Sequence, residues 1–170
     1  MEVTTLKLQT LPYSNVKTYL LAVAFVAGNI ALPQLFHFVP DGGITFLPIY
    51  FFTLIAAYKY GWKVGLLTAL FSPLVNHFLF GMPPLHLLSA IVLKSGLLVV
   101  AAGLAASYFK RISIPILIGV VLLYQIVGTL GEWIIEDSFY TAIQDFRIAI
   151  PGMLLQVFGG YVVMKYLLKK

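Results

Sequence analysis

The stretch LLSAIVLKSGLLVVAAGLAA, residues 87–106, decides the fold, because Lys94 is the only charged residue in it. A helix of this length spans the roughly 30 Å hydrocarbon core of a bilayer. The whole chain shares this character, since 61% of its 170 residues are hydrophobic, 10% are charged and the mean hydropathy is +0.97. Soluble domains are about half apolar and a quarter charged. The sequence therefore predicts an all-α integral membrane protein.

Apolar runs separated by glycine, proline and charge predict six transmembrane helices in a single membrane domain. They are expected at about 18–39, 45–60, 63–81, 84–108, 112–134 and 146–167. The second and third are short and contain Pro48 and Pro73, which favours tilted, kinked or partly broken helices. Proline is also common in membrane helices without such a role. The chain has no cysteine, so disulfides and thiolate metal sites are excluded.

Charged residues divide between the two ends of the predicted bundle. Basic residues share one end, namely Lys7, Lys17, Lys59, Lys63, Lys110, Arg111, Lys165, Lys169 and Lys170. The opposite end is expected to hold Asp41, Glu132, Glu136, Asp137 and Asp145. The positive-inside rule then places both termini in the cytoplasm. Topology and anionic membrane lipid explain the formal net charge of +5, which indicates no nucleic-acid partner.

Three features between residues 45 and 106 are typical of one known family. They are Pro48 early in the second span, the turn YGWKVG at residues 60–65, and Pro73 followed by the turn GMPP at residues 81–84. In these features the chain resembles the substrate-binding S components of energy-coupling factor (ECF) transporters. The resemblance implies the six-helix S-component fold in a bacterial cytoplasmic membrane and the capture of a vitamin or related micronutrient. It also implies a transmembrane coupling subunit and two ATPase subunits as partners.

The resemblance further implies loops that close over the ligand and a helix face that docks on the coupling subunit. The loops correspond here to residues 39–44, 81–85 and 135–145. The docking face corresponds to small residues of the first span, Ala24, Ala27, Gly28 and Ala31. Small residues one turn apart let any helix approach closely, so ordinary packing inside the bundle is the alternative.

Lys94 is expected close to the bilayer midplane, about 15 Å along its helix from the turn at Pro84. A charge at this depth is costly and is expected to face a ligand, a pocket or a partner. Many S components have a glutamate near this place, whereas this chain has a lysine, which reverses the sign of the site. Three interpretations stay open: contact with an anionic ligand, an internal bond to Glu132, a carbonyl or a polar neighbour, and a neutral amine. The first predicts a small, partly flat substrate with a carboxylate or phosphate.

Other polar and aromatic residues are expected in the outer halves of the helices and in the loops. Arg147 can form a bidentate bond to a carboxylate or phosphate, or pair with Asp145 and its acidic neighbours. Tryptophan can stack on a flat ring, and amides can fix its orientation. Besides Lys94, the candidate substrate-binding residues are Arg147, Trp133, Glu132, Asn76, His86, Gln125 and His37, within a wider set that adds Gln34, His77, Tyr140 and Gln144. An interfacial or inter-helix role is the alternative for each.

Sequence motifs argue against several other functions. The chain has no Gly-x-x-x-x-Gly-Lys-Ser/Thr loop, so ATP hydrolysis would come from partners, and no enzyme nucleophile or HExxH motif. His37, His77 and His86 lack a local metal-binding spacing, which makes metal or corrinoid uptake the less favoured substrate class. No cofactor is expected. A solitary membrane carrier, or a structural or interaction protein without transport activity, is the alternative function.

Overall fold

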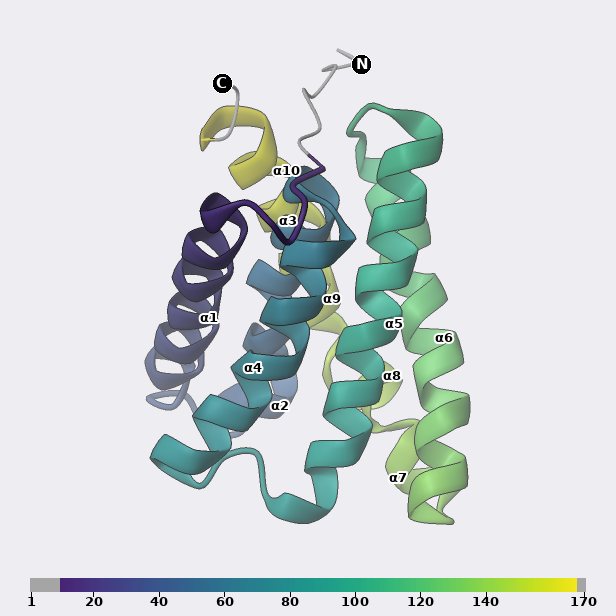
Figure 1. Ribbon diagram of the computed structural model, residues 1–170. Coiled ribbons are helices and arrows are strands. Elements are labelled where there is room, and N and C mark those ends of the chain that lie inside the picture. Colours follow the sequence, from purple (N-terminus) through teal and green to yellow (C-terminus); the bar gives the residue numbers. More distant parts are fainter. Residues whose placement is uncertain (1–9, 168–170) are drawn as a thin grey trace.

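A computed structural model describes residues 10–167, which form helices and no strand (Figure 1). The prediction of an all-α chain is confirmed for these residues. The elements in chain order are α1 (Val16–Phe36), α2 (Gly42–Phe46), η1 (Pro48–Tyr50), α3 (Phe51–Tyr60), α4 (Trp62–Phe80), α5 (Leu85–Phe109), α6 (Ile114–Glu136), α7 (Phe139–Ala142), α8 (Gln144–Ile148), α9 (Ile150–Leu154), η2 (Leu155–Gly159), α10 (Gly160–Val162) and η3 (Val163–Leu167).

Five stretches of the described chain are long and apolar enough to cross a membrane. Four of them are the single helices α1, α4, α5 and α6, and the fifth is the run Gly42–Tyr60, which contains α2, η1 and α3. Each begins and ends within three residues of one of the first five predicted spans. Hydropathy and length therefore locate these helices without tertiary information.

The region predicted as the sixth span, residues 146–167, is built from shorter segments. α8 ends before Ala149, and helical turns then continue from α9 to η3 through two π-helical segments, η2 and η3. Pro151 explains the interruption, because proline lacks the backbone N–H and its ring collides with the preceding turn. Within residues 10–167, five long apolar helices are thus followed by a segmented helical run.

The two prolines of the second and third predicted spans act differently. Before Pro48 the helix is interrupted, and Leu47 between α2 and η1 has a left-handed backbone with φ 45°. Pro73 lies inside α4, which continues through it. The partly broken helix predicted from these prolines therefore occurs at the first of them.

Glycines make the turn between α3 and α4 tight. Gly61 has φ 91°, a left-handed value that favours glycine. One turn later, a Cβ on Gly65 would lie 2.6 Å from the Cβ of Ala57, closer than two carbon atoms can pack. The YGWKVG turn thus lets two antiparallel helices approach each other at backbone distance.

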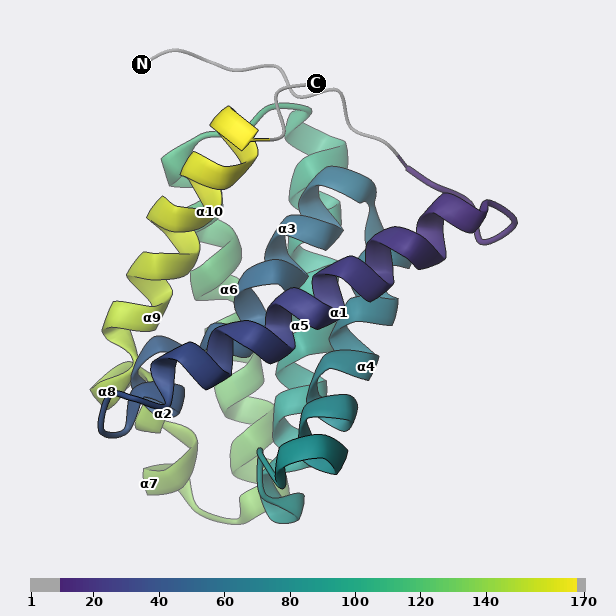
Figure 2. The same cartoon turned by 90° about the vertical axis from the view of Figure 1, so that its left-hand side faces the viewer.

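The helices surround the α2–α3 run, which is the most buried of the five stretches. Within the most apolar window of each stretch, 72% of the residues are buried for Gly42–Tyr60, 39% for α4, α5 and α6, and 11% for α1. Helix α1 packs on α3 and α4 and crosses the outside of the bundle obliquely (Figure 2). A broad apolar face of α1 is therefore left uncovered by the other described residues.

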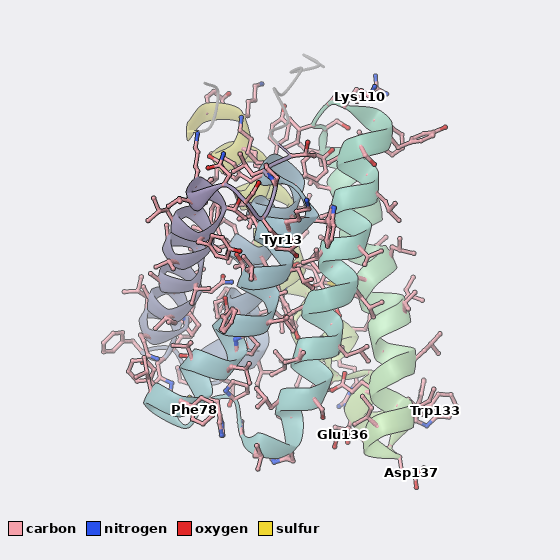
Figure 3. All side chains as sticks on the ribbon, viewed as in Figure 1. Tyr13, Phe78, Lys110, Trp133, Glu136 and Asp137 are labelled. Atoms are coloured by element: carbon pink, nitrogen blue, oxygen red, sulfur yellow. The ribbon has the colours of Figure 1, made fainter. Side chains whose placement is uncertain are left out.

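The two ends of the bundle differ in charge. Lys110 lies at the end where α1 begins and η3 ends, while Glu136 and Asp137 lie at the opposite end (Figures 1 and 3). We call the latter the acidic end. The turn between α4 and α5 and the loop between α1 and α2 lie at the acidic end as well.

Candidate functional site

A cavity of about 520 Å³ lies at the acidic end of the bundle. Its wall includes the end of α1, η1, and parts of α4, α5, α6 and α8. The three loops indicated by the sequence all contribute, through residues 39–44, 82–84 and 144–145. Pockets for small molecules measure about 300 to 1,000 Å³. The cavity therefore has the size of a small-molecule site. Of the lining segments predicted as loops, residues 42–44 lie in α2 and residues 144–145 in α8, so the prediction of a loop is wrong for these residues.

Lys94 forms part of this wall, and 3% of its surface is exposed. Its Nζ lies 2.8 Å from Oδ2 of Asp145 on α8, and it also forms an ion pair with Oε2 of Glu132 on α6. We call these three residues the charged cluster. The internal bond to Glu132, one of the three interpretations left open by the sequence, is present in the structure. The bond to Asp145 joins the same ammonium group to the segment that follows α6.

A glycine makes room for the stem of Lys94. A Cβ on Gly128 of α6 would lie 2.7 Å from Cγ of Lys94. The lysine stem therefore passes directly over the α6 backbone, and its ammonium reaches Glu132 one helical turn further along. This contact explains how a residue of α5 reaches a carboxylate on the neighbouring helix.

Carboxylates outnumber cations around the cavity. The lining residues within 10–167 include the acids Asp41, Glu132 and Asp145 and the single base Lys94, a formal net charge of −2 with His37 neutral. Because Lys94 is already paired with two of these acids, its charge is compensated inside the protein. The cavity wall is therefore acidic.

Two buried side chains add polar groups of another kind. Asn76 on α4 is 3% exposed, and its Oδ1 has no hydrogen-bond partner among the described residues. Tyr50 at the end of η1 is 2% exposed and also lines the cavity. The wall thus includes an asparagine whose buried amide oxygen has no partner within residues 10–167, and a buried tyrosine.

Four of the eight predicted substrate-binding residues line the cavity. They are Lys94, Glu132, Asn76 and His37. Gln34 and Gln144 of the wider predicted set line it as well. These residues come from α1, α4, α5, α6 and α8, so they meet only in the folded bundle.

The other four predicted residues lie elsewhere. Arg147 is exposed with its guanidinium 4.1 Å from the centre of the Tyr140 ring, and Trp133 lies at the outer edge of the bundle (Figure 3). His86 is exposed outside the cavity. Gln125 is buried, does not line the cavity, and donates to the Tyr124 hydroxyl at 3.1 Å. In this structure none of the four faces the cavity.

Sequence reasoning missed Tyr50 as a lining residue and did not pair Asp145 with Lys94. Asp145 falls within the predicted loop 135–145, and the sequence offers it as a partner of nearby Arg147, whereas the fold turns it towards Lys94 on α5. Tyr50 follows Pro48 by two positions in the interrupted second span. That interruption is a usable signal, because broken membrane helices commonly line cavities.

The predicted docking face of α1 divides into two parts. Ala24, Ala27 and Ala31 are exposed on the uncovered side of the helix. Gly28 is turned inwards, where a Cβ would lie 2.8 Å from the ring of Phe52. The three alanines are therefore available to a partner, and the glycine serves packing inside the bundle.

No group of three His, Cys, Asp or Glu side chains within residues 10–167 is placed to hold a metal ion. His77 is one of the three histidines considered for such a site. Its Nδ1 donates a hydrogen bond to the Pro83 carbonyl at 2.7 Å. Comparison with family models, curated proteins and solved structures finds no match to this chain.

Proposed function

We propose that this chain is the membrane-embedded substrate-binding subunit of an ECF-type uptake transporter for a vitamin or related micronutrient. The observation that carries the proposal is the cavity of about 520 Å³ at the acidic end, whose wall contains the three loops that the family resemblance points to. The chain binds the molecule, and partner subunits hydrolyse ATP. A solitary carrier with the same cavity is the second candidate, because no partner is needed to form the wall.

The topology that follows has six spans and both termini in the cytoplasm. The segmented run from α8 to η3 supplies the sixth span, and the end that carries Lys110 faces the cytoplasm by the positive-inside rule. The cavity then opens on the outer side, where a scarce nutrient is captured.

Helix α1 provides the docking face for the coupling subunit. Only 11% of its most apolar window is buried among residues 10–167. Its exposed alanines form a smooth strip, which a second membrane helix can approach closely. Membrane lipid covers the same face when the partner is absent.

Purification from native membranes tests the function. We expect the protein to carry a small molecule detectable by native mass spectrometry, and to bring a transmembrane coupling subunit and two ATPase subunits with it. A retained molecule without these subunits would favour the solitary carrier. A protein that carries neither the small molecule nor the partner subunits would favour a structural or interaction role.

A substitution on α1 tests the docking face separately. Ala27→Trp should abolish co-purification of the coupling subunit while the small molecule is retained, because a bulky side chain prevents close helix approach. Ala27→Ser keeps the strip small and is the matched control. Equal co-purification of both variants would remove the docking assignment.

A further inference from the structure

The charges around the cavity indicate what kind of molecule it accepts. Three carboxylates and one ammonium line it within the described residues, and the ammonium of Lys94 is already held by Glu132 and Asp145. We propose that the cavity recognises its ligand through a cationic nitrogen group. This inference rests on the proposed function, in that the cavity binds a small molecule, and it replaces the anionic ligand expected from Lys94 alone.

An anionic ligand would meet an unfavourable field. To reach Lys94 it would have to approach Glu132 and Asp145 at distances similar to its distance from the ammonium, and two repulsions outweigh one attraction. The low-dielectric surroundings of the cavity strengthen this difference. A cation experiences the same balance with the opposite sign, and Asp41 adds to the attraction from another part of the wall.

Asn76 is a second, independent observation that points to the same ligand chemistry. Its Oδ1 is buried, has no hydrogen-bond partner among residues 10–167, and belongs to a residue of the cavity wall. A buried acceptor without a donor is costly, so a ligand N–H group that reached this oxygen would gain more than at an exposed acceptor. The wall thus combines negative charge with a hydrogen-bond acceptor.

Tyr50 narrows the ligand class further. Its buried ring lines the cavity, and the face of an aromatic ring attracts a nearby cation. A protonated amine or amidine has the positive charge that suits the carboxylates and the ring, and the N–H groups that suit the amide oxygen. A quaternary ammonium would leave the Asn76 oxygen without a donor.

Cysteine labelling measures the charge preference of the cavity without knowledge of the ligand, since the chain has no cysteine of its own. Leu87 lines the cavity and is partly exposed, seven residues before Lys94 on α5. Leu87→Cys would be reacted with two methanethiosulfonates of similar size, one carrying a trimethylammonium group and the other a sulfonate. His86→Cys is the matched control, because His86 is the neighbouring residue, is exposed and lies outside the cavity.

The measured quantity is the rate of labelling by the cationic reagent divided by the rate for the anionic reagent. We expect this ratio to be at least about tenfold higher at Leu87→Cys than at His86→Cys, as in clefts lined by one sign of charge. Asp145→Asn should reduce this preference. Because Asp145→Asn also removes a partner of Lys94, Asp41→Asn is the second variant, and its asparagine tolerates the left-handed backbone of φ 54°. It should lower the preference as well.

A preference equal to or below that at His86→Cys would overturn the inference, as would a preference that neither aspartate variant reduces. These outcomes differ from failure of the proposed function. A protein that retains a micronutrient and its coupling subunits but labels without charge preference would contradict the cationic ligand alone. A protein with a cation-selective cavity that retains neither would contradict the uptake function alone.

Discussion

Two of the buried polar clusters in this bundle are built in opposite ways. In the first, the amide of Asn29 donates to the hydroxyls of Thr53 at 2.9 Å and Ser72 at 3.0 Å and accepts from the backbone N–H of Phe52 at 3.1 Å. It carries no charge and lines no part of the cavity. In the second, the charged cluster, two carboxylates share one ammonium beside an open space.

The difference separates a structural role from a binding role. The cluster around Asn29 joins α1 to α3 and α4 with each of its amide groups engaged, as buried polar groups in a membrane protein require. The charged cluster has two carboxylates and one ammonium, so its charge is not balanced among these three residues. Intramembrane ionisable residues beside a cavity commonly mark a substrate pathway.

The largest effect is expected from Lys94→Met. Removal of the ammonium leaves Glu132 and Asp145 buried side by side without a counter-charge, and breaking a buried ion pair in this way costs about 3 to 5 kcal/mol. The free energy of unfolding, measured by denaturing-detergent titration in mixed micelles, should fall by that amount. The triple variant that adds Glu132→Gln and Asp145→Asn should recover most of the loss. A single variant as stable as the parent protein would show that the cluster is not a unit.

Asn29→Ala should have the next largest effect. It removes three hydrogen bonds that join α1 to its neighbours, at a cost of about 2 kcal/mol after relaxation. Thermal denaturation followed by circular dichroism should show a lowered midpoint. Asn76→Ala is the matched control, because Asn76 is equally buried but its Oδ1 has no partner within the described chain. If both variants melt alike, the three hydrogen bonds of Asn29 add no more stability than a buried asparagine with an unpartnered oxygen.

Gly128→Ala should have the smallest effect. The added methyl group meets the stem of Lys94, and overpacking of this kind costs about 1 kcal/mol when one flexible side chain can yield. Gly119→Ala on the same helix serves as its control, since no atom lies within 4 Å of the added Cβ there. That control should be neutral or stabilised by about 0.5 kcal/mol in the same unfolding titration. A Gly128→Ala variant as stable as Gly119→Ala would contradict the close packing of Lys94 on Gly128.

The sequence by itself determined the all-helical, apolar character, the places of five membrane-length stretches out of the six spans it predicted, and the interruption at Pro48. These features depend on hydropathy, length and proline chemistry, which act over neighbouring residues. It also identified Lys94 as the informative charge and included Glu132 among its possible partners. Local physics suffices for these conclusions because a bilayer imposes one length and one polarity on each span.

Only the tertiary structure decided which side chains meet. A helix that is apolar on all sides gives no signal for its rotation about its own axis, and each residue turns the side chain by about 100°. Trp133 therefore faces outwards and Glu132 inwards although they are adjacent. The bond between Lys94 and Asp145 joins residues 51 positions apart, and it depends on how α8 packs between α7 and the interruption before Pro151. Helix rotation and inter-helix packing are properties of the assembled bundle, so no single segment of the sequence contains them.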